Sequence, residues 1–360
     1  MSTANNTELV RERSVEVEDK PDLQAGGTST THRPPALGGG KTQGRRVRRP
    51  GNVIFESLAK GSAILITVII ALIALFLLVR AVPAMNTLQD GFLSFFTYAE
   101  RWNTNHATNG GKMQFGIPNL FFTTVLVSLL ALLLAMPVAL GVAIFLSNYC
   151  PKRLVKPLGF MVDLLAAVPS IVFGIWGIQV LGPAIGPFLQ WLSSWAGGIF
   201  LFNFEQGTSP AFSTARNIFT GGVVLAIMIL PVIAATTREV FVQTPQGQIE
   251  AALALGATRW EVVRMTVLPF GMSGFVSGSM LGLGRALGET MALYMVIASS
   301  PGFRGSLMDG GTTFATAIAN AAPEFNDDLK AGAYIAAGLV LFVLTFVVNA
   351  AARSAITKKS

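Results

Sequence analysis

The sequence predicts an all-α integral membrane protein with six transmembrane helices. Of its 360 residues, 52% are hydrophobic and only 12% are charged, and the mean hydropathy is +0.57. This composition is typical of membrane proteins rather than of soluble domains. Uncharged runs recur along the chain, and each is long enough at about 1.5 Å per residue to cross a hydrocarbon core of about 30 Å.

The amino-terminal segment, residues 1–52, is predicted to be a disordered basic cytoplasmic tail ahead of a six-span domain at 53–360. It is polar, rich in Gly, Pro, Thr and Arg, and closes with RRVRRPGN. Such a segment buries too little apolar surface to offset the entropy of ordering. Its GGGKT run ends like a phosphate-binding loop, but Pro35 stands where the first glycine belongs. We therefore interpret it as a flexible linker and assign no nucleotide to this chain.

The first two spans are expected at 62–79 and 119–146, where uncharged and mostly aliphatic residues run together. The third is expected at 158–181, although it contains Asp163 and the breaker-rich VPSIVFGIWG. Between the first two spans, 80–118 is polar and aromatic, which predicts an external loop with interfacial aromatic side chains. After the third span, 182–216 mixes Gly and Pro with tryptophans. It is expected to lie at the outer interface or to enter the membrane only partway.

The remaining spans are expected at 217–237, 271–300 and 331–352. A long charged loop, 238–270, separates the fourth span from the fifth. Internal prolines such as Pro231 are tolerated in membrane helices where neighbouring helices satisfy the freed carbonyl groups. The spans are therefore expected to form a packed bundle.

The distribution of cations predicts the orientation of this bundle. With the amino terminus inside, 19 of the 26 Lys and Arg residues lie on the cytoplasmic side, six lie outside, and Arg285 falls within a span. An excess of cations marks the cytoplasmic side. We expect a multi-pass protein of the bacterial cytoplasmic (inner) membrane with both termini in the cytoplasm.

Several classes of function find no support in the residues. The net charge of +7 resides mostly in the tail, so no basic surface for nucleic acid is predicted. Cys150 is the only cysteine, which excludes an internal disulfide, and His32 and His106 are the only histidines. No cluster is therefore spaced to bind a metal, and the spans carry no arrangement typical of a catalytic site.

The loop 238–270 has features that a simple connector does not need. EAALAL at 250–255 favours a helix, and Gly256 can break it. Thr258 can cap a second short helix over 258–265, and Pro269 ends the segment. The predicted hairpin exposes small residues, which allow close approach to a groove on another protein. The alternative is an interfacial hairpin that only links two spans.

Two charges are expected inside the fifth span. Arg285 and Glu289 are four residues apart, hence on one face of a single helix. Ionised groups at that depth cost several kcal/mol unless they are paired or face a cavity. Either the two side chains pair with each other, or Arg285 offers a guanidinium fork to an oxyanion while Glu289 holds it until the anion competes.

Four glycines of the same span have the small-xxx-small spacing that favours close helix packing. They fall into two pairs, 278/282 and 284/288. Helix packing is the favoured interpretation over a direct backbone site for an anion.

The loop residues also carry a family resemblance. EAA at 250–252, Gly256 and the Leu268-Pro269 pair resemble the EAA-x3-G-x9-I-x-LP motif of ABC importer permeases, with Thr266 in place of the usual isoleucine. GLGRALGETMA in the fifth span resembles the PstC-type permease subunits of phosphate ABC importers. The resemblance covers roughly residues 90–350.

This resemblance implies a type I, MetI-like permease architecture with a cytoplasmic coupling hairpin between spans four and five. It implies a sister permease (PstA-like), nucleotide-binding ATPase subunits (PstB-like) that hold ATP and Mg, and an extracytoplasmic phosphate-binding protein (PstS-like). This chain would have no cofactor and no catalytic residue, would contact membrane lipid, and would carry phosphate past Arg285 and Glu289. The residues implied in coupling to the ATPase are Glu250, Ala251, Ala252, Gly256, Leu268 and Pro269. Three charges beside them, Arg259, Glu261 and Arg264, would add polar contacts.

Two other classes of function remain open from the residues. A permease of the same architecture could carry another oxyanion, such as sulfate or molybdate. A non-transporting membrane scaffold or a membrane enzyme is the third class, but a scaffold has no need of Arg285 and Glu289 within a span. Phosphate import is the function that the sequence favours.

Overall fold

The computed structural model describes residues 50–100, 102–105, 110–202, 215–299, 305–325 and 327–357. The chain separates into two compact units, Met1–Ala59 and Lys60–Ser360, and the account below concerns the second. The predicted tail and its GGGKT run lie outside the described residues. The exceptions are the last three residues of the tail, 50–52, which are the first turn of a helix.

In the part of the chain that the structure describes, six helical runs are long and apolar enough to cross a membrane. This confirms the predicted all-α fold with six membrane helices. The six runs are Val53–Met85, Pro118–Tyr149, Ser170–Ala196, Ile218–Val242, Arg259–Leu287 and Asp328–Ser354.

Four helices contain the predicted spans and extend past them. They are α1 (Pro50–Met85), α3 (Pro118–Ile144, continued by a π-helical turn over Phe145–Tyr149), α8 (Ile218–Val242) and α14 (Asp328–Thr357). Asn217 begins α8, because its side chain accepts a hydrogen bond from the backbone N–H of Thr220 at 2.9 Å. The helices exceed the apolar runs because polar residues beyond the hydrocarbon continue the same hydrogen-bond pattern.

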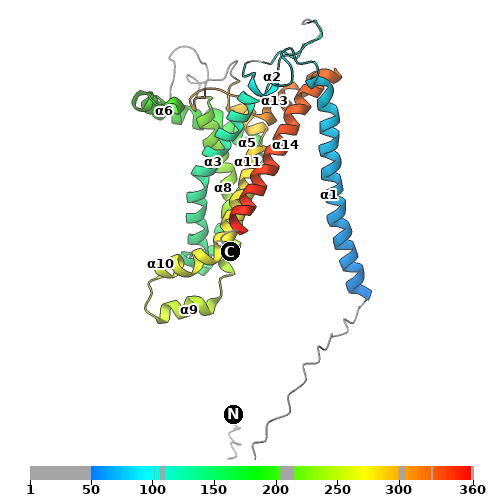
Figure 1. Ribbon diagram of the computed structural model, residues 1–360. Helices are drawn as coiled ribbons and strands as arrows, with labels where there is room; N and C mark the ends of the chain where they lie inside the picture. The colour runs from blue at the N-terminus through cyan, green and yellow to red at the C-terminus, as the bar shows by residue number, and fades with distance from the viewer. Residues whose placement is uncertain are drawn as a thin grey trace, which may run out of the picture. The chain divides into compact units, whose positions relative to one another are not determined.

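The third span differs from the prediction. The segment 158–181 is not one helix but the end of α4 (Lys152–Ala166), then α5 (Ser170–Trp176) and a π-helical turn, Gly177–Leu181. Pro169 explains the break, since the residue before a proline is disfavoured in the helical region. The helix then continues as α6 (Gly182–Ala196), which runs crosswise to α3 and α8 in Figure 1.

The fifth span was expected as one helix at 271–300, and this is wrong at both ends. Helix α11 (Leu268–Leu287) stops early, and after three non-helical residues the chain resumes as α12 (Met291–Val296). At its start, α11 continues directly from α10 (Arg259–Val262) through a π-helical turn. Pro269 does not end a helix: it follows the π-helical turn Val263–Val267 directly and is the second residue of α11.

The centre of the bundle is an apolar cluster shared by α3, α5, α8, α11 and α12. Helix α11 packs closely on α8 at Gly278 and Gly282. A side chain on Gly278 would collide with Thr236, and one on Gly282 would lie 2.8 Å from Cγ1 of Ile233. The small-residue packing is thus confirmed for this pair but not for Gly284, which has open space around it.

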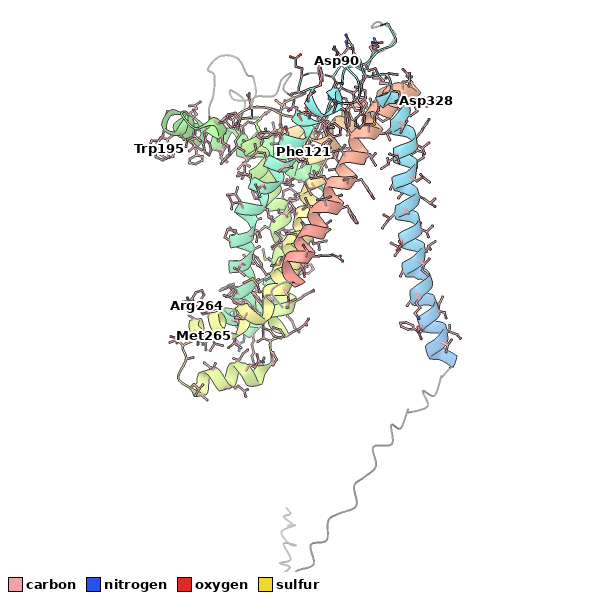
Figure 2. The ribbon with its side chains drawn as sticks, in the orientation of Figure 1. Asp90, Phe121, Trp195, Arg264, Met265 and Asp328 are labelled. Atoms are coloured by element: carbon pink, nitrogen blue, oxygen red, sulfur yellow. The ribbon has the colours of Figure 1, made fainter. Side chains whose placement is uncertain are left out.

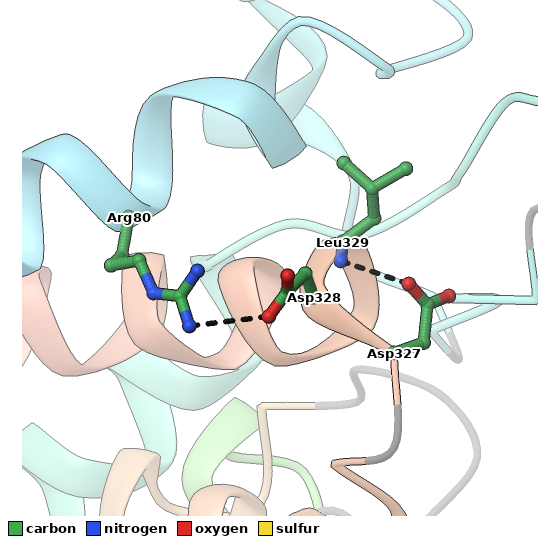
Figure 3. Close-up of polar contacts among 4 residues, drawn as sticks. All are labelled: Arg80, Asp327, Asp328 and Leu329. Carbon is green, nitrogen blue, oxygen red and sulfur yellow. Dashed lines mark hydrogen bonds and ion pairs between the residues drawn. The ribbon is translucent and has the colours of Figure 1, made fainter.

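A second apolar cluster ties the ends of α1 and α14 to α13 (Phe314–Ala321). Phe95 of the short helix α2 (Ser94–Thr97) and Phe115 are fully buried in it. An exposed ion pair, Arg80 to Asp328 at 3.1 Å, also joins α1 to α14 (Figure 3). Exposed pairs contribute about 0–1 kcal/mol, so the apolar cluster is the main contact.

The two ends of the bundle carry different features. Figure 2 shows Arg264 and Met265 at the end where α10 lies, and Trp195 and Asp328 at the opposite end. Helix α8 runs from the end that carries Trp195 toward the end where α10 lies, and α11 runs in the opposite direction.

Candidate functional site

The loop 238–270 forms a hairpin of two helices, α9 (Gln246–Ala254) and α10, below the bundle in Figure 1. The turn between them depends on Gly256, whose φ is +86°. Glycine adopts this left-handed conformation readily, whereas a residue with a Cβ is strained there. The predicted break at Gly256 is therefore present, and we call residues 246–267 the coupling hairpin.

The second arm of the coupling hairpin begins with a capping box. The hydroxyl of Thr258 accepts a hydrogen bond from the backbone N–H of Glu261 at 3.4 Å, while the Glu261 carboxylate accepts one from the Thr258 N–H at 2.7 Å. The carboxylate also accepts the Thr258 hydroxyl at 2.8 Å. These reciprocal bonds define the first turn of α10, as the sequence predicted for Thr258.

The tip of the coupling hairpin presents exposed residues of mixed character. Glu250 and Ala251 are exposed and Ala252 is half-buried. Two large apolar side chains are also exposed, Leu255 at 90% and Trp260 at 55%. An exposed apolar surface on an otherwise polar element is typical of an interaction site.

The last two residues of the family motif lie elsewhere. Leu268 is half-buried and packs against a small apolar cluster of Ala143, Phe241 and Val267. Pro269 is exposed in the first turn of α11. The predicted coupling residues therefore divide into an exposed tip, 250–256, and a base that joins the hairpin to the bundle.

Arg285 lines a groove of about 1030 Å³ between α11 and α14, with Val232 of α8 at its edge. We call it the α11–α14 groove. Its other lining residues are Ser277, Met280, Leu281, Gly284, Phe346, Asn349, Ala350 and Arg353. Arg285 therefore lines a groove, and its place in a substrate pathway stays a prediction.

The charge of the α11–α14 groove is entirely positive. Two guanidinium groups line it, Arg285 and Arg353, together with the polar side chains of Ser277 and Asn349, and no carboxylate of the described residues does. Guanidinium groups donate two parallel hydrogen bonds to planar or tetrahedral oxyanions. The positive charge of the groove therefore favours an anion over a cation.

The side chain of Glu289 does not form an ion pair with Arg285. The helix ends between them, at Leu287, so the two residues do not share a helix face. Glu289 instead accepts a hydrogen bond from the backbone N–H of Ala292, and among the described residues it forms no ion pair with Arg285. Of the two alternatives for these charges, the one in which they pair with each other is absent among the described residues.

The break between α11 and α12, residues 288–290, lies at membrane depth. On one side of it Gly282 packs against Ile233 of α8, and on the other side Leu293 packs against Gly221. The break therefore lies alongside the middle of a spanning helix. Non-helical backbone at this depth is tolerated only where protein covers it or where it lines a water-filled cavity.

The chain matches a known family over most of the bundle. Residues 135–356 match the binding-protein-dependent transport system inner membrane component. The chain belongs to this family. It is thus a multi-pass inner membrane protein of the ABC importer type, as its six apolar helices indicate.

Similar proteins support this family assignment along nearly the whole chain. A phosphate transport system permease protein PstC 2 of Mycobacterium tuberculosis is 53% identical over 311 residues, which are 86% of this chain and 93% of that protein. A phosphate transport system permease protein PstC of Mesorhizobium japonicum is 38% identical over 305 residues, 84% of this chain and 89% of that one. The predicted resemblance to PstC-type permeases is confirmed.

The fold also has a counterpart among solved structures. The crystal structure of a bacterial ABC transporter involved in the import of the acidic polysaccharide alginate aligns with 86% of this chain and 99% of that chain. Its sequence identity is 18% and its TM-score is 0.51, so the likeness concerns the fold alone. The predicted ABC importer permease architecture is confirmed for this family member.

Two residues of the α11–α14 groove, Asn349 and Arg353, are not among the site residues that the sequence predicts. Asn349 falls within the apolar run expected as the sixth span, 331–352, and Arg353 follows that run directly. Their spacing of four residues places them on one helix face. A polar residue inside a span followed by a cation one turn later is the signal that could have found them.

Proposed function

We propose that this chain is the permease subunit through which an ATP-driven importer carries inorganic phosphate across the cytoplasmic membrane. The observation that carries the proposal is the 53% identity with a phosphate transport system permease over 86% of the chain. The more distant relative, at 38% identity, bears the same description.

The α11–α14 groove supports the choice of an anion. It pairs two guanidinium groups with neutral polar side chains and has no carboxylate in its lining. Arg285 would exchange hydrogen bonds with phosphate oxygens during passage, since charge-assisted bonds to an oxyanion are strong yet reversible. Glu289 would act on the backbone by holding the start of α12.

The partners follow from the permease family. A sister permease would complete the pathway, separate ATPase subunits would hold ATP and Mg, and an extracytoplasmic binding protein would deliver phosphate. The exposed tip of the coupling hairpin, with Ala251, Leu255 and Trp260, would dock on the ATPase. No covalent step would take place on this chain.

The proposal is tested by ATP-dependent uptake in vesicles that contain the co-expressed complex. Labelled phosphate and labelled molybdate are offered separately, and sulfate is added as a competitor. We expect uptake of phosphate that requires ATP and that sulfate does not suppress. Uptake of molybdate without phosphate would refute the substrate assignment, and the absence of any ATP-dependent uptake would refute the transport function.

A further inference from the structure

A second polar cavity, of about 410 Å³, opens at the end of the bundle remote from the coupling hairpin. It is built from Ile178 of the π-helical turn, from the segment ahead of α8, from α12 and the residues after it, and from α13 with the residues before it. Its polar lining residues are Arg216, Tyr294, Ser299, Thr312, Thr313, Thr316 and Asn320. We call it the Arg216 cavity.

Arg216 is held in this cavity by the backbone. One terminal nitrogen of its guanidinium donates a hydrogen bond to the carbonyl of Met295 at 2.9 Å. Its own carbonyl accepts one from the N–H of Ala298 at 2.8 Å. The Nε atom is buried and has no partner, and among the described residues no carboxylate pairs with this guanidinium.

Such a group is costly without a ligand. A buried guanidinium donor that makes no hydrogen bond has lost water without compensation. The conformation of Arg216 is nevertheless defined, because backbone contacts hold both its side chain and its main chain. The cavity therefore contains a positioned guanidinium whose Nε–H makes no hydrogen bond to the described residues.

Hydroxyl groups complete the lining. The hydroxyls of Ser299 and Thr312 lie 3.3 Å apart, and Tyr294 donates to the side-chain oxygen of Asn320 at 3.1 Å. A hydroxyl can donate to an anion while accepting from its neighbour. The Ser299 and Thr312 pair thus leaves one proton free for a ligand oxygen.

Among the residues that the structure describes, none that lines the cavity is acidic, which favours an anionic ligand. Asp309 is close in sequence and buried, and its backbone carbonyl accepts the N–H of Ile218. Its side chain is not among the residues that line the cavity. One fixed cation with neutral hydroxyl and amide groups suits a small oxyanion.

We propose that the Arg216 cavity is a receiving site for a tetrahedral oxyanion, which the substrate occupies before it reaches the α11–α14 groove. That the oxyanion is phosphate rests on the proposed function. The Arg216 cavity lies just before the start of α8, and the coupling hairpin follows the end of α8. The two ends of α8 are about 37 Å apart, since the helix has 25 residues at 1.5 Å each. The two cavities share no lining residue, so they can be tested separately.

The test is protection of a thiol placed in the cavity. Ser299→Cys is introduced into the assembled complex in a Cys150→Ala background, because Cys150 is the only native cysteine. The rate of modification by a small neutral maleimide is measured against inorganic phosphate, with chloride at matched ionic strength as the reference. We expect phosphate, but not chloride, to slow the reaction in a saturable manner.

Two further variants assign the effect to Arg216. Arg216→Gln should raise the phosphate concentration that gives half protection at least about tenfold, since charge-assisted hydrogen bonds are among the strong ones. Thr312→Val, which keeps the side-chain volume, should raise it severalfold and guards against misfolding of the arginine variant. Arg80→Gln removes an exposed cation from the same end of the bundle and should leave protection unchanged.

The outcomes separate this site from the proposed function. The receiving site is refuted, and the transport function stands, if the complex takes up phosphate but phosphate does not protect the thiol. The same holds if phosphate protects the thiol equally well in the Arg216→Gln variant and in the parent. If molybdate alone protects and molybdate alone is taken up, the site stands and the phosphate assignment fails. If Arg80→Gln lost as much protection as Arg216→Gln, the effect would come from the general surface charge of this end of the bundle, and the site would be refuted.

Discussion

The carboxylate of Glu289 accepts a hydrogen bond from the backbone N–H of Ala292 at 3.1 Å. This bond satisfies one of the free donors at the start of α12, within the break that interrupts a membrane helix. Arg285, one turn earlier in the chain, lies in the α11–α14 groove with Arg353. The two charges of the GRALGET stretch therefore have different roles, one holding the backbone and the other available to an anion.

The capping role of Glu289 predicts different effects for two substitutions. Glu289→Gln keeps a side-chain oxygen that can accept the Ala292 N–H, so uptake and thermal stability should stay close to the parent. Glu289→Ala removes the acceptor and should destabilise the complex by about 0.5–2 kcal/mol, with reduced uptake. Thermal unfolding in detergent and vesicle uptake measure both, and a Gln variant as impaired as the Ala variant would show that the charge matters instead.

The groove predicts that the guanidinium of Arg285 is required for transport. Arg285→Gln should lower phosphate uptake at least about tenfold, because it removes charge-assisted hydrogen bonds to the anion. The complex should still assemble, since no described carboxylate depends on this arginine. Co-purification of the subunits checks assembly, and Arg80→Gln is the matched control for loss of a cation. Normal uptake by Arg285→Gln would contradict a role in the pathway.

The left-handed turn of the coupling hairpin predicts a coupling defect at Gly256. Gly256→Ala forces a Cβ into a conformation with φ of +86°, which costs about 1–2 kcal/mol and displaces α9 relative to α10. We expect fewer phosphate ions transported per ATP hydrolysed. Uptake and ATPase activity are measured in the same vesicles.

Gly247→Ala is the control for this experiment. Gly247 lies inside α9 with open space around it, so alanine there favours the helix. Its coupling ratio should match the parent. A Gly256→Ala ratio that also matches the parent would argue that the hairpin is only a connector.

The contact between α11 and α8 predicts a stability difference between two glycines. Gly278→Ala introduces a side chain against Thr236, and overpacking of this kind costs about 1–3 kcal/mol. Gly284→Ala meets nothing within 4 Å and should be neutral or slightly stabilising, because alanine is the better helix former. Thermal unfolding of the purified complex compares the two, and equal midpoints would count against close packing at Gly278.

The spans could be predicted from sequence where one apolar run corresponds to one helix. This holds for α3, α8 and α14, whose runs are uncharged from end to end. It fails where short-range geometry interrupts an apolar run, at Pro169 and again after Leu287. Hydropathy reports only whether a segment is apolar. These breaks depend instead on the local backbone conformation and on the side chains that pack around the non-helical residues.

The candidate site was predictable in its parts but not in its assembly. Arg285 and Gly256 could be singled out because a charge in a span and a glycine in a loop are local signals. Arg285 and Arg353 line the same groove although they are 68 positions apart, and nothing in a single sequence indicates that they share a site. The Arg216 cavity could not be predicted for the same reason, since it brings together four separate segments of the chain.

The uninterrupted helix Arg259–Leu287, about 44 Å long for its 29 residues, starts in the coupling hairpin and ends at the break. Over its middle part this helix packs closely on α8 at Gly271, Gly274, Gly278 and Gly282, a stretch of about 17 Å. A displacement of the hairpin would therefore pass along α11 as a sliding of two packed helices, toward Arg285, and not as a swing about one point.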